Sequence, residues 1–175
     1  TDLHHLMFYS KKPEELQDYF VANVLGCSEA ISAGTQKESF QDILVSTLKD
    51  DCDYSVVRTI HENLNEMIEE TKDAPEPLTL GKQEVKRLFT ASGVPEEKME
   101  SFDKDYDETI GRQTTLLASN IAETRKFSVK TPEIVVNVNP DRADLVDIQV
   151  IDGRKCLVIP IDEEVEVNGI AVNAK

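Results

Sequence analysis

The sequence predicts an α+β protein: an acidic helical region over residues 1–120, then an antiparallel β-meander of five or six strands over residues 121–175, packed against helices. Three observations predict this class. Apolar residues recur every three or four positions up to about residue 110, and the period changes to two from Arg125 onward. The dipeptides Asp152-Gly153 and Asn168-Gly169 each lie between alternating apolar runs, which is typical of tight β-hairpins. We expect one compact unit.

Five amphipathic segments in the first region are predicted as helices, beginning near Pro13, Thr35, Asp53, Gln83 and Pro95. The second has a capping box, in which Thr35 and Glu38 satisfy each other's backbone N–H groups. Its predicted inward face consists of Phe40, Ile43, Leu44 and Leu48. Residues 74–78 carry two prolines that cannot continue a helix, so a break is predicted there.

Both Gly-containing dipeptides supply the positive φ angles of a type I′ turn, which fixes the pairing of the strands on either side. Counting outward from the two turns puts aliphatic side chains on one face, where burial favours a cover of helices. The predicted pairs are Val150 with Lys155, Ile148 with Leu157, Val146 with Ile159, Val167 with Ile170, and Val165 with Val172.

Composition indicates a soluble cytoplasmic protein. The 175 residues have no apolar run approaching the ~20 residues that cross a bilayer, so no membrane association is expected. Cys27, Cys52 and Cys156 are widely separated and odd in number, which argues against a disulfide framework. The first residue is Thr1, from which we expect this chain to be the C-terminal part of a longer protein.

The net charge of −15 argues against direct nucleic-acid binding. Residues 1–120 carry 24 acids and 12 bases, whereas residues 121–175 carry 10 acids and 7 bases. The basic residues Arg125, Lys126 and Lys130 flank Phe127 and could contact phosphates, but lysines that protect an edge strand explain them equally.

The weak metal candidates are Asp51, Asp53 and Glu62, whose oxygens fall at positions of a calcium-loop frame. Val56 occupies the position where that loop requires glycine, and an acidic first turn of a helix explains the same residues. No catalytic residue and no cofactor-binding residue is predicted, because the chain has no nucleophile elbow, zinc-protease signature or glycine-rich phosphate loop.

Several segments resemble the C-terminal part of the uncharacterised bacterial "domain of unknown function 4317" family. They are His61–Glu70, Glu84–Leu88, Leu116–Asn120, Thr124–Phe127, Ile151–Arg154, Cys156–Ile161 and Glu164–Gly169. The resemblance spans nearly the whole chain and carries over no activity, ligand or catalytic residue. It implies that the chain is the back half of a longer cytoplasmic protein.

The function is unknown from the sequence, and three hypotheses remain open. The first is a non-enzymatic binding or protein-interaction module, with a protein partner such as the missing N-terminal half or a second copy in a homo-oligomer. The second is an enzyme, or the regulatory half of one, whose site at the helix-sheet junction uses His4, His5 and His61. The third is an acidic nucleic-acid mimic, which requires carboxylates spaced like phosphates.

Overall fold

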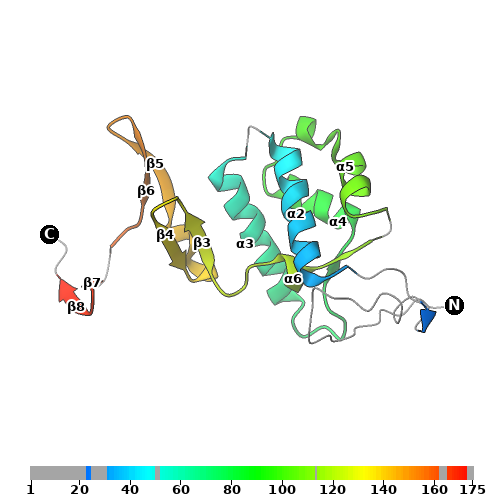
Figure 1. Ribbon diagram of the computed structural model, residues 1–175, viewed down its shortest axis with the longest axis horizontal. Coiled ribbons are helices and arrows are strands. Elements are labelled where there is room, and N and C mark those ends of the chain that lie inside the picture. Colours follow the sequence, from blue (N-terminus) through cyan, green and yellow to red (C-terminus); the bar gives the residue numbers. More distant parts are fainter. Residues whose placement is uncertain (1–22, 25–30, 50–51, 113, 162–164, 173–175) are drawn as a thin grey trace. The chain divides into compact units, whose positions relative to one another are not determined.

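The computed structural model describes residues 23–24, 31–49, 52–112, 114–161 and 165–172. Along the chain, helices precede antiparallel strand pairs, so the α+β class is confirmed (Figure 1). The chain divides into two compact units, residues 1–123 and residues 124–175. Within the described ranges, none of the helices combines the length and the apolar character that crossing a bilayer requires.

The first unit contains two long helices, α2 (Ala33–Leu48) and α3 (Tyr54–Glu70). The predicted capping box at the start of α2 is wrong. Ser32 is the N-cap, and its Oγ accepts a hydrogen bond from the Thr35 N–H at 3.0 Å, which satisfies one of the first free N–H groups of the helix. The predicted inward face is confirmed, because Phe40, Ile43, Leu44 and Leu48 are all buried.

A helical hairpin follows the proline-containing linker. Its arms are α4 (Lys82–Ala91) and α5 (Phe102–Thr109). Gly93 has φ of 89° and ends the first arm in a conformation that glycine adopts without steric cost. The continuous helix predicted from Pro95 is instead a 3₁₀ turn, η2 (Glu96–Met99), followed by α5.

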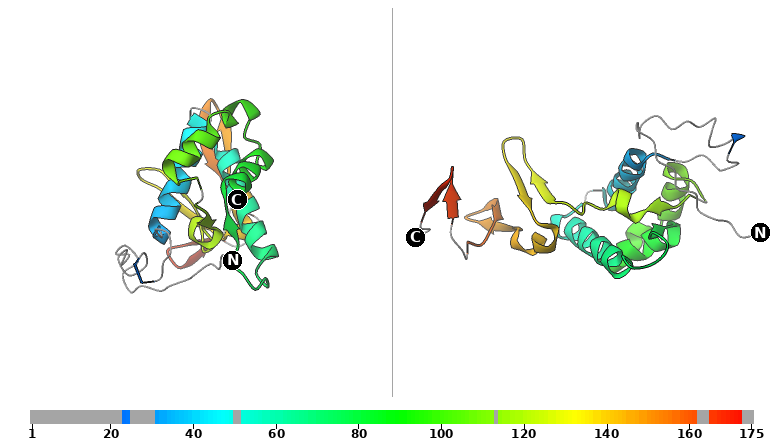
Figure 2. Two further views of the ribbon diagram at one scale, coloured as in Figure 1. Left: turned by 90° about the vertical axis from the view of Figure 1, so that its right-hand side faces the viewer. Right: turned by 90° about the horizontal axis from the view of Figure 1, so that it is seen from below.

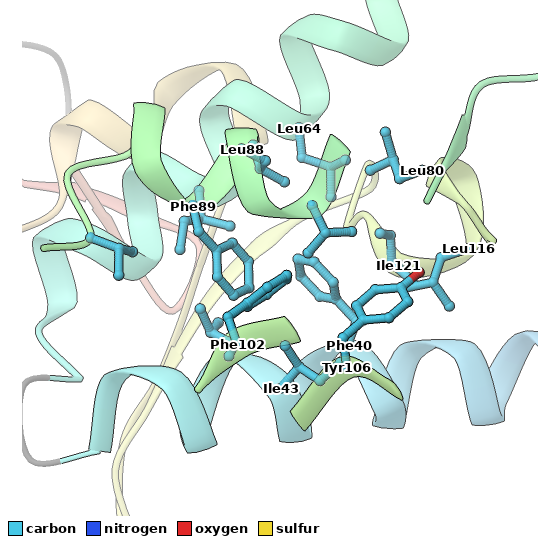
Figure 3. Packing of buried hydrophobic residues seen from close by; sticks show 14 of the residues in the cluster. Phe40, Ile43, Leu64, Leu80, Leu88, Phe89, Phe102, Tyr106, Leu116 and Ile121 are labelled. Carbon is cyan, nitrogen blue, oxygen red and sulfur yellow. The ribbon is translucent and has the colours of Figure 1, made fainter. Parts of the chain in front are cut away.

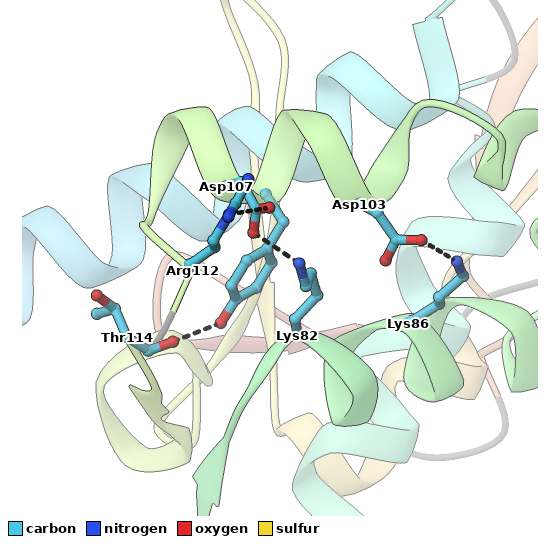
Figure 4. Close-up of polar contacts among 7 residues, drawn as sticks. Lys82, Lys86, Asp103, Asp107, Arg112 and Thr114 are labelled. Carbon is cyan, nitrogen blue, oxygen red and sulfur yellow. Dashed lines mark hydrogen bonds and ion pairs between the residues drawn. The ribbon is translucent and has the colours of Figure 1, made fainter.

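Two ion pairs join the arms of this hairpin (Figure 4). Lys82 Nζ lies 2.7 Å from Asp107 Oδ1, and Lys86 Nζ lies 2.7 Å from Asp103 Oδ2. The earlier lysine of α4 pairs with the later aspartate of α5, so the two helices run antiparallel. Both pairs are partly exposed, and we expect each to stabilise the hairpin by about 1 kcal/mol or less.

A two-residue ladder closes the hairpin at its base. β1 (Thr79–Leu80) pairs antiparallel with β2 (Leu116–Leu117), and the short helix α6 (Ala118–Ile121) follows directly. The sequence pattern does not predict these strands, because two residues are too few to show a period of two. The ladder joins the segment just before α4 to the segment just before α6.

The helices of the first unit lie close together (Figure 2). Residues of α2 to α5 contribute to one hydrophobic core, in which aromatic rings form a chain (Figure 3). Ring centroids lie 5.8 Å apart for Phe40 and Phe89, 5.6 Å for Phe89 and Phe102, and 5.9 Å for Phe102 and Tyr106. The first two pairs are edge-to-face, an arrangement that the ring quadrupoles favour.

The Tyr106 hydroxyl group is satisfied at the edge of this core. It donates a hydrogen bond to the Thr114 carbonyl oxygen at 2.9 Å (Figure 4). Burial, with the nearby carboxylates of Glu84 and Asp107, raises the pKa of Tyr106 to about 12. The phenol is therefore neutral at physiological pH, which suits its structural position.

The described residues of the second unit form three hairpins, each a separate two-stranded antiparallel sheet. They are β3 (Phe127–Lys130) with β4 (Val135–Val138), β5 (Asp147–Ile151) with β6 (Arg154–Val158), and β7 (Val165–Val167) with β8 (Ile170–Val172). A 3₁₀ segment, η3 (Pro140–Leu145), precedes β5.

Both predicted glycine turns are confirmed by their backbone angles. φ is 51° at Asp152 and 77° at Gly153, and 50° at Asn168 and 84° at Gly169. The register follows from the turns as predicted, with one exception: the β5–β6 ladder ends one pair short of Val146 and Ile159. The confirmed pairs are Val150 with Lys155, Ile148 with Leu157, Val167 with Ile170, and Val165 with Val172.

The prediction of a single meander of five or six strands is wrong, because no strand of one hairpin pairs with a strand of another within the described residues. Much of the predicted apolar faces is also exposed rather than covered, although Val146 is buried. The exposed fraction is 69% for Val150, 43% for Ile148 and 52% for Val167. Hairpin turns are encoded locally, whereas joining hairpins into a sheet requires contacts that a period of two does not specify.

Candidate functional site

Of the three carboxylates predicted as weak metal ligands, the two that are described, Asp53 and Glu62, make contacts at the start of helix α3 or within it. Asp51 lies outside the described residues. Asp53 is the N-cap, and its Oδ1 accepts hydrogen bonds from the Ser55 N–H at 2.9 Å and the Ser55 hydroxyl at 3.1 Å. Glu62 Oε1 lies 3.4 Å from Arg58 Nε. Among described residues, no three His, Cys, Asp or Glu side chains are arranged to hold a metal ion.

The histidines of the enzyme hypothesis are only partly placed, since His4 and His5 lie outside the described residues. His61 lies on α3 near Lys37 and Glu123, whose charged groups pair at 2.8 Å. Burial lowers the pKa of His61, the positive charge of Lys37 lowers it further, and Glu123 opposes them. The neutral imidazole is thus favoured, and its Nδ1 has no hydrogen-bond partner within the described residues.

One depression of about 570 Å³ lies on α5 and is lined by charged residues, namely Asp103, Lys104, Asp107, Glu108 and Arg112. Each of them already belongs to an ion pair with a neighbour. Arg112 Nε lies 3.3 Å from Asp107 Oδ2, which also faces Lys82 (Figure 4). Lys104 Nζ lies 3.6 Å from Glu108 Oε1. These pairs leave no charge here without a partner.

A second depression, the α3–α4 groove, has a different character. It encloses about 460 Å³, within the usual ~300–1,000 Å³ of ligand sites, and is lined by Asn63, Glu66, Met67, Glu70, Glu84, Arg87, Leu88 and Ala91. Its apolar lining, called the floor below, consists of Met67, Ala91 and Leu88, and Leu88 also belongs to the buried core. A hydrogen bond at 2.9 Å from Asn63 Nδ2 to Ser92 Oγ ties the two helices together at one end.

The walls of the α3–α4 groove carry charges without partners. Glu66 and Glu70 on α3, and Arg87 on α4, make no ion pair with any other described residue. By contrast, Glu62 pairs with Arg58, and Glu69 pairs with Lys72. Among the described residues, the glutamates of α3 that form no ion pair are therefore Glu66 and Glu70, and both line the groove.

Glu84 is the third acid of the groove, and one of its carboxylate oxygens already accepts a hydrogen bond. Its Oε2 accepts a hydrogen bond from the Gly81 N–H at 3.1 Å, which caps α4. Negative groups thus outnumber the single positive group of Arg87 around an apolar floor. Such a lining suits a ligand that combines apolar side chains with positive charge.

Sequence reasoning missed the groove because Leu88 and Met67 follow the same apolar periodicity as the core residues. The helix pattern nevertheless contains a signal. Glu62 and Glu69 have a base three or four positions away, whereas Glu66 and Glu70 have none. An acid without a helical partner, next to an apolar stripe, marks the edge of the groove.

Comparisons with known proteins give a family and no further relative. The model of the family described as "Domain of unknown function (DUF4317)" matches residues 1–170. No curated protein and no solved structure matches the chain.

Proposed function

We propose that this chain, which belongs to the family of the domain of unknown function DUF4317, is a protein-interaction module that binds a basic, apolar segment of a partner in the α3–α4 groove. The observation that carries the proposal is the coincidence of an apolar floor with walls whose acids Glu66 and Glu70 lack ion-pair partners among the described residues. The expected partner segment is an amphipathic helix with lysine or arginine beside its apolar stripe.

Apolar contacts are expected to supply most of the affinity. Met67 has a flexible, polarisable side chain that adapts to different ligand shapes, which is common on surfaces that bind amphipathic helices. The carboxylates would orient the ligand and accelerate encounter, because opposite charges steer association even where each exposed pair contributes ~1 kcal/mol or less. The net charge of −15 on the whole chain also attracts a positively charged ligand.

The cytoplasmic setting belongs to this proposal. Cys52 and Cys156 are free thiols, as expected for a reducing compartment. The enzyme and nucleic-acid-mimic hypotheses stay predictions, and no contact among the described residues favours either over the groove.

A direct binding assay tests the groove. A fluorescently labelled helical peptide of leucine and lysine is titrated with the full chain, and fluorescence anisotropy is measured. The Glu66→Gln/Glu70→Gln variant should bind this peptide ~3- to 10-fold more weakly, the loss expected for two exposed charge pairs. A leucine–glutamate peptide with the same apolar pattern should not bind.

The matched control removes two exposed acids elsewhere, by Glu96→Gln/Glu97→Gln on η2. It changes the net charge equally, so it should leave the affinity nearly unchanged. Equal losses in both variants would show that the peptide responds only to net charge, and the groove proposal would be abandoned.

A further inference from the structure

The outer edge of β5 carries one charged side chain, Asp147, and no lysine, arginine or proline. Lysine, arginine and proline discourage pairing at an edge, and β6 carries Arg154 and Lys155 while β3 carries Lys130. The five residues of β5 include none of these types. Within the described residues its only neighbouring strand is β6, so one edge is open to a further strand.

Backbone geometry shows which groups face outward from this edge. The Ile148 N–H donates to Asp147 Oδ1 at 2.8 Å, so it is directed away from β6. Because outward and inward backbone groups alternate along a strand, those of Val150 face the same way. The outward groups therefore belong to two exposed aliphatic residues.

We propose that the partner of this edge is β5 of a second copy, paired antiparallel about Gln149. In that register Ile148 of each copy lies opposite Val150 of the other. The Ile148 N–H exchanges its bond to Asp147 Oδ1 for one to the Val150 carbonyl oxygen of the other copy, and the Val150 N–H donates to the Ile148 carbonyl oxygen of the other copy. Leu157 lies beside Ile148 on the same face. The result is a four-stranded sheet, whereas an isolated two-stranded hairpin is marginally stable in water.

The charge distribution favours a second copy at this hairpin. Residues 147–158 contain two acids and two bases and are neutral within a chain of net charge −15. Two copies therefore meet where their repulsion is smallest. The single charge on β5, Asp147, lies opposite Ile151 of the second copy, so no like charges face each other.

Sedimentation of the full chain over a range of concentrations tests this association. We expect a monomer–dimer equilibrium. The dissociation constant of the dimer should rise at least ~10-fold in Val150→Lys, because a lysine then replaces one member of the apolar pair. The matched control, Val167→Lys on β7, alters another exposed valine and should leave the equilibrium unchanged. A chain that stays monomeric, or an equal loss in both variants, would overturn the proposal.

Cross-linking tests the register in a background where Cys27, Cys52 and Cys156 are serine, since Cys156 pairs with residue 149 inside the hairpin. Gln149→Cys lies on the symmetry axis, with a Cα separation of ~4.5–5.5 Å that a disulfide spans. Ile151→Cys lies on the same face, but its two copies would be roughly 13 Å apart, beyond disulfide reach. Faster dimer formation through Gln149→Cys supports the register, and equal or slower formation contradicts it.

Discussion

At the scale of single residues, the acids of α3 differ in what they do. Asp53 caps the helix, and Glu62 pairs with Arg58 one turn away. Glu66 and Glu70 form no ion pair with another described residue, and both line the α3–α4 groove together with Arg87. Carboxylates thus stabilise the helix at one position and, in the function proposed above, bind the ligand at another, depending on their neighbours.

His61 gives a pH-dependent prediction. Its pKa in the folded chain lies below 6.5, so the unfolded chain binds a proton more readily and the neutral imidazole contributes stability above pH ~6.5. That contribution is lost as the pH falls through 6.5 toward the folded pKa, at up to ~1.4 kcal/mol per pH unit. The free energy of unfolding, measured with urea, should therefore decrease between pH 7.5 and pH 5.5 by more in the wild type than in His61→Gln.

The two pH dependences are compared because the wild type and the variant share every titratable group except His61. Parallel stability curves for the wild type and His61→Gln would mean that burial does not hold this imidazole in its neutral form.

At the scale of elements, the turn glycines are the most local feature of the fold. Gly153 has φ of 77° and no atom near the position of an added Cβ, so Gly153→Ala costs only backbone strain, ~1–2 kcal/mol. Amide exchange in β5 and β6 should accelerate roughly 5- to 30-fold, and Gly153→Asn should recover much of the protection. Gly34→Ala, at an ordinary helical φ, should leave exchange in these strands unchanged.

Local elements could be predicted from the sequence, and their assembly could not. The inward faces of α2 and both type I′ turns follow from apolar spacing and from residues that tolerate positive φ. The N-cap of α2 was assigned to Thr35 because Glu38 completes a capping box, yet Ser32 offers its hydroxyl group one turn earlier. The β1–β2 ladder is too short to leave a pattern.

At the scale of the whole molecule, charge and apolar surface are distributed separately. The net charge of −15 lies mostly in the helical region, whereas exposed valine and isoleucine side chains lie mainly on the hairpins. The sequence shows where the charge lies, but it wrongly predicts that helices cover the hairpin aliphatics and that the hairpins join into one sheet, because a strand edge does not encode its partner. The candidate groove was missed for a similar reason: its floor residues look like core residues until α3 and α4 are placed side by side.

The most direct test of the central claim is amide chemical-shift mapping of the isotope-labelled full chain with the leucine–lysine peptide. We expect the largest shifts in residues 63–70 and 84–91, the parts of α3 and α4 that border the groove. Shifts spread evenly over the acidic surface, including η2, or confined to the hairpins, would contradict the claim that the α3–α4 groove is the binding site.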